Sequence, residues 1–249
     1  MKLKFKIQQY QTDAVESVIN VFKGQPNQAN LEYRMDKGKL YVVDSKKHDI
    51  KFVQTDVFAD SDDAGNNLGY KNNRLAIDKV ALFDNIRQIQ TENNIHQDEE
   101  LCQKLGACQL DVEMETGTGK TYVYIKTMFE LNKQYGWTKF IVVVPSIAIR
   151  EGVKKSFDIT VDHFMEQYGK KARYFIYDSS SLNDIDTFSQ SNDISVMIIN
   201  TQAFNTMISA RMNLELVADF SDKDIIINNV PKRQGGRGVS KSDEGGVET

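Results

Sequence analysis

Met-Glu-Thr-Gly-Thr-Gly-Lys-Thr, residues 114–121, is the stretch that decides the fold of this chain. An apolar alternation over residues 110–114 leads into it and predicts a strand, and helical spacing follows over residues 121–135. Gly136 stands where a helix C-cap is expected. A Gly-rich turn between a strand and a helix directs backbone N–H groups and the helix dipole toward an anion. The stretch therefore predicts a phosphate-binding loop.

The residue types in this loop suit the phosphates of a nucleotide. Gly117 and Gly119 allow positive φ and a close backbone approach. Lys120 supplies a positive charge for the β- and γ-phosphates and the Thr121 hydroxyl is placed to ligate Mg²⁺, so these two are the predicted catalytic residues. Met114 departs from the strict pattern, which has Gly there, and the alternative is a surface turn. The predicted nucleotide-binding positions of the loop are Glu115, Thr116, Gly117, Thr118, Gly119, Lys120 and Thr121.

Downstream of the loop, short apolar runs alternate with helical spacing. Residues 140–144, 174–177 and 195–199 predict strands, and residues 147–157 and 162–168 predict helices. The unbroken apolar run at residues 140–144 is typical of a strand buried on both faces. Strands separated by helices predict an α/β fold, a P-loop domain with a parallel sheet flanked by helices.

Upstream of the loop the pattern is less regular. The segments predicted there are a strand at 2–7, a helix at 14–22, a strand at 39–43, solvated loops at 56–63 and 65–73, and a helix at 75–89. Past residue 210 the chain is polar and Gly-rich, which predicts a poorly ordered tail. We therefore expect an N-terminal segment with its helix, an insertion, a nucleotide-binding core and a tail, at residues 1–24, 25–107, 108–210 and 211–249.

Composition places the chain among ordinary globular proteins. Its 249 residues are 40% apolar and 27% charged, with a net charge of −4, which argues against a strongly basic nucleic-acid-binding arm. No apolar run reaches the length of a membrane span and the N-terminus lacks a signal-peptide block, so we expect a cytoplasmic protein without a membrane partner. Cys102 and Cys108 match no zinc pattern, and His48, His96 and His163 predict no catalytic or metal role.

Three further segments accompany the loop. Gln11 opens an amphipathic helix, Val-Val-Val-Pro-Ser-Ile-Ala-Ile-Arg (142–150) follows one predicted strand, and Ile-Ile-Asn-Thr-Gln-Ala-Phe-Asn (198–205) follows another. Together with the loop they resemble the first RecA-like lobe of superfamily 2 helicases and translocases. More narrowly, they resemble the restriction (Res) subunit of type III restriction-modification enzymes. The resemblance is dense over residues 108–205, and none is found after about residue 210.

The resemblance implies a function that depends on ATP and Mg²⁺. By this resemblance Gln11 recognises the adenine edge, where an amide can make paired hydrogen bonds. Pro145, Ser146, Arg150 and Thr201 contact the nucleic-acid backbone without reading its sequence. The alternatives are a solvent-facing Gln at a helix start, and helix N-caps beside a surface Arg. The family implies a DNA-dependent ATPase and translocase whose full-length form cleaves double-stranded DNA, with a modification (methyltransferase) subunit as partner.

The Asp-Glu pair that such a motor uses to hold Mg²⁺ and polarise water is not found after a predicted strand. The one pair after the loop, Asp243-Glu244, lies in the Gly-rich tail, and a positional candidate at residues 225–229 carries Asn228 and Asn229 instead. A second RecA-like lobe and a nuclease domain are not recognised. The chain resembles the front of a longer protein, and alone we expect it to bind ATP without efficient hydrolysis.

Two alternatives stay open. The first is the leading lobe of another superfamily 2 helicase that acts on DNA or RNA. The second is a non-catalytic nucleotide-binding remnant. The segment Ala-Ile-Arg-Glu-Gly-Val (148–153) favours the restriction family over another helicase.

Overall fold

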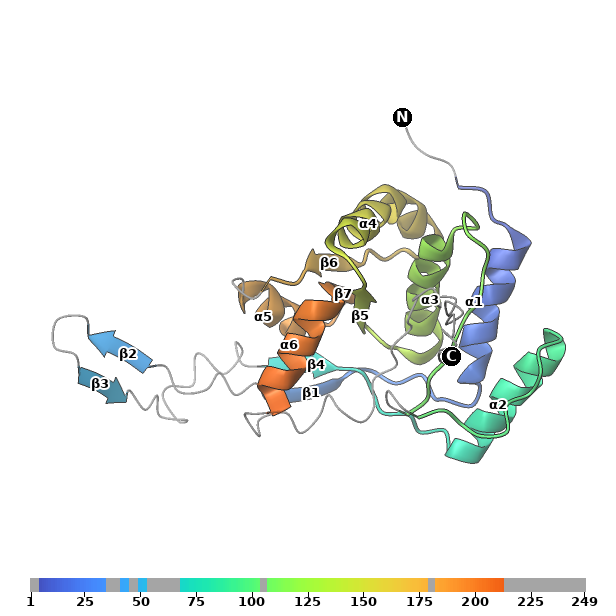
Figure 1. The fold of residues 1–249 in the computed structure, drawn as a ribbon, viewed down its shortest axis with the longest axis horizontal. Coiled ribbons are helices and arrows are strands. Elements are labelled where there is room, and N and C mark those ends of the chain that lie inside the picture. The colour runs from blue at the N-terminus through green and yellow to red at the C-terminus, as the bar shows by residue number, and fades with distance from the viewer. Residues whose placement is uncertain are drawn as a thin grey trace, which may run out of the picture.

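The computed structural model describes residues 5–34, 41–44, 49–52, 68–103, 107–178 and 182–212. They form a mixed α/β protein around a three-stranded parallel sheet (Figure 1). The strands run in the order β5-β7-β6, namely β5 (Lys139–Val144), β7 (Ser195–Asn200) and β6 (Arg173–Ile176). The predicted α/β class, the parallel pairing and the places of these three strands are confirmed.

The central strand of the sheet is β7. It pairs with β5 along its whole length and with β6 on its other side. Its residues from Ser195 to Ile199 are all buried, because helices cover both faces of the sheet. The sequence predicts full burial for the strand at residues 140–144, but the strand that is fully buried is β7. Among the described residues strand β5 has one strand neighbour, and most of its own residues are only half-buried.

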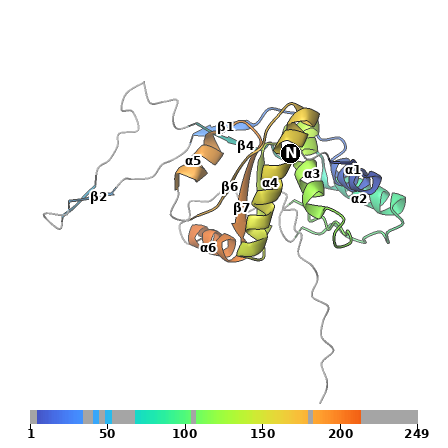
Figure 2. The same cartoon turned by 90° about the horizontal axis from the view of Figure 1, so that it is seen from above.

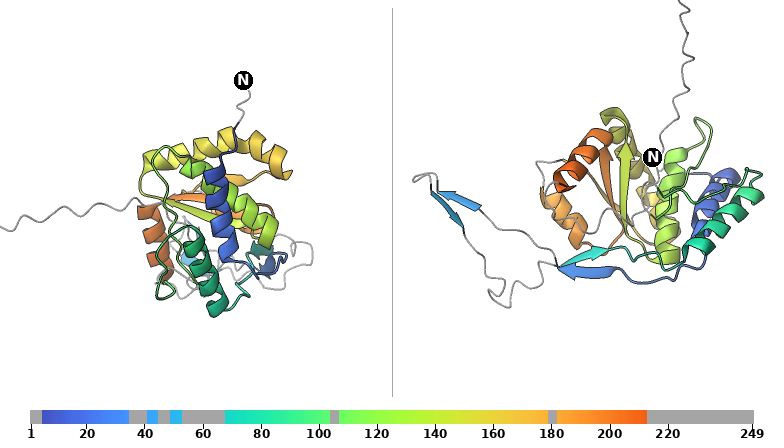
Figure 3. Two further views of the ribbon diagram at one scale, coloured as in Figure 1. Left: turned by 90° about the vertical axis from the view of Figure 1, so that its right-hand side faces the viewer. Right: turned by 60° about the horizontal axis from the view of Figure 1, so that its bottom comes forward.

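Helices form a layer on each face of this sheet. Figures 2 and 3 show α3 (Lys120–Tyr135) and α4 (Ile147–Tyr168) on one face, and α5 (Leu182–Gln190) and α6 (Thr201–Met212) on the other. Under the first pair lies a buried cluster, here called the sheet cluster, which includes Ile125, Phe164 and Ile198. Burying an apolar side chain of this size stabilises a fold by roughly 1.5–3 kcal/mol. The helix predicted at 121–135 is confirmed, and it ends at Gly136 with φ +79°.

Helix α4 is one helix of 22 residues, where the sequence predicts two helices with a break at residues 158–161. It begins after Ser146, whose hydroxyl accepts a hydrogen bond from the Ile149 N–H at 3.3 Å. The β-branched residues near its middle lower helix propensity. However, Phe157 and Phe164, on either side of them, are buried in the sheet cluster. Tertiary burial therefore keeps the helix continuous.

A second buried cluster, here called the flank cluster, lies where α1 (Gln9–Val21) and α2 (Lys79–Glu92) pack beside α3. Phe22 is fully buried there, and its ring makes an edge contact with Trp137 at 5.2 Å between centroids. The helices predicted at 14–22 and 75–89 are confirmed in place. Helix α2 begins later than predicted, because the Asp78 carboxylate accepts a first-turn N–H at 2.8 Å and caps it.

Two predicted strands are wrong. Residues 110–114 form no strand, although Leu110, Val112 and Met114 alternate as predicted and pack against the flank cluster. A strand exists through its ladder of hydrogen bonds, and no segment among the described residues pairs with this one. Residues 5–7, the described part of the strand predicted at 2–7, also lie outside any strand.

The predicted insertion contains two antiparallel ribbons. Strand β1 (Leu31–Arg34) pairs with β4 (Leu68–Lys71), and β2 (Tyr41–Asp44), which overlaps the strand predicted at 39–43, pairs with β3 (Asp49–Phe52). The loop predicted at 65–73 therefore contains a strand. Gly69 permits this pairing, because a Cβ there would lie 2.5 Å from the Tyr33 ring of the opposite strand. The predictions for residues 56–63 and for the tail beyond residue 212 fall outside the described residues.

Amide side chains join the β1–β4 ribbon to the sheet. The Asn72 side chain accepts hydrogen bonds from the N–H groups of Thr138 at 2.8 Å and Lys139 at 2.9 Å, and donates one to the Lys139 carbonyl at 2.8 Å. The Asn30 amide donates to the Thr138 hydroxyl. One side chain thus takes the place of a neighbouring strand at the start of β5. The insertion is thereby held at the end of the sheet where the strands begin.

We predict that Asn72→Ala lowers the free energy of unfolding by about 1–3 kcal/mol, because backbone groups of Thr138 and Lys139 lose their partners. Urea unfolding followed by circular dichroism measures the change. Asn205→Ala, at an exposed position of α6, is the matched control, and its effect should stay within about 0.5 kcal/mol. An Asn72→Ala protein as stable as the wild type would contradict this role.

Candidate nucleotide and nucleic-acid site

The loop before α3 has the backbone shape that an anion-binding loop needs. Gly117 and Gly119 have φ of +84° and +86°, in the left-handed region that favours glycine. The Thr118 hydroxyl donates to the Glu115 carbonyl at 2.7 Å and closes the turn. Among the described residues, none beyond its chain neighbours lies within 4 Å of a Cβ placed at Gly117, so the loop is open there. The first N–H groups of α3 have no partners within the helix and face an incoming anion.

Lys120 and Thr121 are the first two residues of α3. Lys120 is half-buried, and within the part of the chain that the structure describes it has no hydrogen-bond or ion-pair partner. An unpaired cation beside free N–H groups suits a phosphate. Thr121 stands in the same first turn, where a hydroxyl can ligate a phosphate-bound Mg²⁺. The loop residues present therefore fit a nucleotide with its magnesium ion.

Helix α1 brings Gln11 onto this loop from 107 residues away in the sequence. Its side-chain Nε2 donates to the Thr118 carbonyl at 2.8 Å, and the Tyr10 hydroxyl donates to the same oxygen at 3.3 Å. A Cβ at Gly119 would lie 2.6 Å from Gln11 Nε2. Gln11 therefore contacts the loop and does not simply face solvent. The sequence reasoning missed Tyr10, for which the only signal was an aromatic residue next to Gln11.

Pro145, Ser146 and Thr201 lie together where β5 and β7 end. The Thr201 hydroxyl donates to the last carbonyl of β5 at 3.1 Å, which places this side chain against the turn that carries Pro145. Ser146 is the N-cap of α4. Thr201 is not an N-cap: α6 starts at Thr201 itself, and the Asn200 side chain accepts a first-turn N–H at 3.0 Å instead.

Arg150 follows one turn into α4, on the same edge. Its Nη2 contacts the Glu151 carboxylate at 3.3 Å, in an ion pair whose acidic partner is exposed and therefore weakly bound. Its Nε is buried and has no hydrogen-bond partner among the described residues. A buried donor without a partner costs free energy that an anionic oxygen would recover. A guanidinium with such an unused donor has the chemistry to bind an anionic oxygen.

Other groups with reactive chemistry form no site. Burial raises the pKa of the Cys108 thiol to about 11, so it stays protonated at neutral pH. In the described ranges, three or more His, Cys, Asp or Glu side chains nowhere gather as metal ligands.

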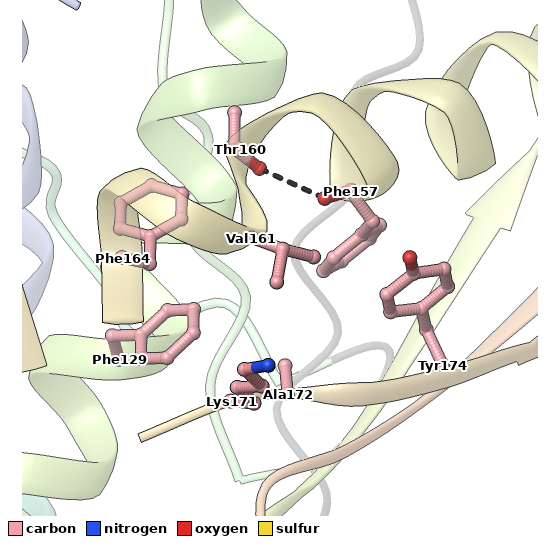
Figure 4. Close-up of a pocket in the computed structure, with 8 residues that line it drawn as sticks. All are labelled: Phe129, Phe157, Thr160, Val161, Phe164, Lys171, Ala172 and Tyr174. Carbon is pink, nitrogen blue, oxygen red and sulfur yellow. Dashed lines mark hydrogen bonds between the residues drawn. The ribbon is translucent and has the colours of Figure 1, made fainter. Parts of the chain in front are cut away.

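None of the helices in the described ranges has the length and apolar character to cross a membrane. The hollow in Figure 4 is lined mainly by rings such as Phe157, Phe164 and Tyr174, and its Thr160 hydroxyl is bonded to the helix backbone.

These residues define a mixed α/β protein in which a Gly-rich loop opens a buried helix beside a parallel sheet. Comparison with known families matches residues 4–228 to the family of the type III restriction enzyme, res subunit. Because this match spans most of the chain, the protein belongs to the family of type III restriction enzyme Res subunits. Membership in this family implies ATP binding.

Individual relatives agree with this family. The chain is 38% identical over 111 residues to the Res subunit of EcoP15I from Escherichia coli, and 36% identical over 112 residues to that of EcoPI from Escherichia phage P1. Each of these alignments covers 43% of this chain and 11% of the relative. The Res subunit of StyLTI from Salmonella typhimurium is 39% identical over 92 residues, which is 36% of this chain and 9% of that protein. The chain thus spans only a small part of the length of these relatives.

We predict that Gly119→Ala destabilises the protein more than Gly117→Ala. Both substitutions place alanine at positive φ, which costs about 1–2 kcal/mol, but only the Cβ at Gly119 also displaces Gln11 from Thr118. The additional loss, about 0.5–1.5 kcal/mol for one hydrogen bond, is measured by urea unfolding without nucleotide. In a Gln11→Ala background the two glycine variants should become equal. A difference that persisted there would show that the Gln11 contact is not its cause.

Proposed function

We propose that this chain is the ATP-binding, RecA-like lobe of a type III restriction endonuclease Res subunit. The observation that carries the proposal is the hydrogen bond from Gln11 to the Thr118 carbonyl, which holds a side chain suited to adenine beside a phosphate-binding loop. A nucleotide extends from its base to its phosphates, so both recognition elements must lie within the length of one ligand. The family match supports the same assignment.

Two segments that lack a neighbouring strand on one or both sides, among the described residues, support the RecA-like topology. Strand β5 hydrogen-bonds to β7 on one side only, and residues 110–114 alternate like a strand but lack a partner among the described residues. We propose that further strands lie between these two segments and supply a ladder to both. In this division, residues 1–24 recognise adenine, 25–107 form an insertion, 108–210 form the core and 211–249 follow it.

Each loop residue has a role toward ATP in this proposal. The backbone N–H groups of residues 115–119 hold phosphate oxygens, Lys120 balances the charge of the β- and γ-phosphates, and the Thr121 hydroxyl holds Mg²⁺. When bound, Mg²⁺ neutralises charge on the phosphates and fixes their orientation. The Gln11 side-chain oxygen remains available to accept a hydrogen bond from adenine, because only its Nε2 is engaged with the loop.

The edge formed by Pro145, Ser146, Arg150 and Thr201 is proposed to hold the backbone of double-stranded DNA. Helices α4 and α6 both begin at this edge, so their N-terminal N–H groups face the same ligand. In the full-length protein, this lobe would support DNA-dependent ATP hydrolysis and translocation that lead to DNA cleavage. The modification (methyltransferase) subunit is the proposed protein partner.

The chain alone is proposed to bind ATP without efficient turnover. After the loop, its 249 residues contain one Asp-Glu pair, Asp243-Glu244, which stands in a Gly-rich stretch. A motor of this class uses such a pair at the end of a core strand to activate water. An inactive remnant that does not bind nucleotide is the second candidate, so a nucleotide-binding measurement separates the two.

We expect Mg·ATP at about 100 times its Kd to stabilise the folded chain by about 2.7 kcal/mol, which raises the Tm in a thermal shift assay. Lys120→Ala should remove most of this rise, because the phosphates lose their cation. Lys133→Ala removes an exposed cation from the opposite end of α3 and is the matched control. No shift at millimolar Mg·ATP would favour the remnant.

Phosphate release with and without double-stranded DNA tests the claim about turnover. We expect a negligible rate in both cases, because no Asp-Glu pair that could activate water follows a strand in the part of the chain that the structure describes. A rate of about one per second that Lys120→Ala abolished would overturn the claim, since typical enzymes turn over at least that fast.

We predict that Arg150→Ala weakens binding to double-stranded DNA through the loss of one phosphate contact. The slope of the logarithm of affinity against the logarithm of salt concentration should fall by about 1. Fluorescence anisotropy of a labelled duplex at several salt concentrations measures this slope. Lys133→Ala removes the same charge elsewhere and should keep the wild-type slope. Identical slopes for Arg150→Ala and the wild type would argue against a DNA-contacting Arg150.

A further inference from the structure

Three aromatic side chains, here called the junction, meet directly behind the phosphate loop. Tyr122 follows Thr121 in the first turn of α3, His163 belongs to α4, and Phe5 lies in the segment before α1. The Tyr122 hydroxyl is 2.9 Å from His163 Nε2. The Phe5 ring lies 5.0 Å from the imidazole, between centroids. The junction therefore joins three segments at the helix end that carries the loop.

The Tyr122 ring is held between two other rings. Phe5 stacks on it with centroids 5.9 Å apart and an interplanar angle of 19°, and Phe164 stacks on it at 5.4 Å and 24°. Phe164 is itself 1% exposed and belongs to the sheet cluster. Stacking between two rings leaves the phenol little freedom, so its hydroxyl has a fixed direction toward His163.

The hydrogen bond of the junction joins two neutral groups. Burial raises the pKa of the Tyr122 phenol. Burial also lowers the pKa of the His163 imidazole, with smaller effects from Glu166, which raises it, and Lys126, which lowers it. At neutral pH the phenol therefore keeps its proton and the imidazole is neutral, and the imidazole tautomer sets which of the two groups donates.

The same helix end is also connected to α1. Lys126, one turn after Tyr122, is 5% exposed and donates to the Thr12 hydroxyl at 3.4 Å. The Gln11 bond to Thr118 lies next to it. These two bonds fix α1 to the loop and to α3. The junction is the corresponding connection from α4, so both α1 and α4 hold the start of α3.

We propose that Tyr122 and His163 are positioning residues whose hydrogen bond aligns the first turn of α3, and with it Lys120 and Thr121, for nucleotide phosphates. This inference rests on the proposed nucleotide site, but it concerns two side chains outside that site. Tyr122 is covalently next to Thr121, so a rotation at the start of α3 would displace the Lys120 and Thr121 side chains together. A role in packing alone would change stability without changing nucleotide affinity.

Tyr122→Phe tests the inference in the 249-residue chain, because it removes the hydroxyl and keeps the stacked ring. We expect the Kd for the Mg²⁺ complex of a fluorescent ATP analogue to rise about 2- to 10-fold, which corresponds to one neutral hydrogen bond. Tyr168→Phe is the matched control: the Tyr168 hydroxyl also joins α4 to α3, through a 2.7 Å bond to Glu130 at the far end of α3. It should lower the Tm at least as much, because its acceptor is a carboxylate, and leave the Kd unchanged.

Substitutions at His163 test the partner. His163→Gln can present an amide near the place of Nε2 and should restore a Kd close to that of the wild type, whereas His163→Ala should match Tyr122→Phe. The double variant Tyr122→Phe/His163→Ala should bind no more weakly than either single variant, because both remove the same bond. An unchanged Kd in Tyr122→Phe, or an equal rise in Tyr168→Phe, overturns the inference.

Hydrogen exchange separates failure of this inference from failure of the proposed function. A folded wild type that binds no nucleotide contradicts the proposed function. In that case hydrogen exchange still tests whether the Tyr122–His163 bond orders the first turn of α3. Tyr122→Phe should speed exchange of the amides at residues 123–126, which are the first to donate hydrogen bonds within α3, in the absence of nucleotide, and Tyr168→Phe should not. Equal exchange of these amides in the two variants overturns the inference.

Discussion

The burial of helix α3 on two sides is the constraint on which the rest of the structure depends. Val123 and Leu131 belong to the flank cluster with α1 and α2, whereas Ile125 and Phe129 belong to the sheet cluster with α4, β5 and β7. A helix packed on both sides cannot slide or rotate without opening a cavity on one side and an overlap on the other. The loop at its N-terminus therefore has one position relative to α1 and α4.

A few polar contacts then orient the side chains at this end of α3. Gln11 reaches the Thr118 carbonyl from α1, and His163 reaches Tyr122 from α4. Apolar burial supplies most of the free energy, but it is not directional, so it cannot by itself aim a lysine or a hydroxyl at a ligand. In this member of the Res subunit family, the candidate site is formed by side chains that several segments bring to one helix end.

Sequence reasoning succeeded where structure depends on neighbouring residues. The loop, α3 and the three strands of the sheet follow from glycines and hydrophobic periodicity within short windows. It failed where a distant partner decides the outcome. Residues 110–114 alternate correctly but find no ladder, the middle of α4 stays helical because Phe157 and Phe164 are buried, and Gly69 lies in a strand because the Tyr33 ring fills the space opposite it.

The sequence by itself determined the α/β class, the Gly-rich loop before a helix and the resemblance to Res subunits, because glycine geometry, periodicity and motif spacing are properties of short segments. Only the tertiary structure decided which distant side chains meet. Gln11 and Thr118 are 107 residues apart, Thr201 and the end of β5 are 57 apart, and Tyr122 and His163 are 41 apart. Such contacts depend on how helices pack around α3, which no local pattern encodes, since one periodicity is compatible with many packings.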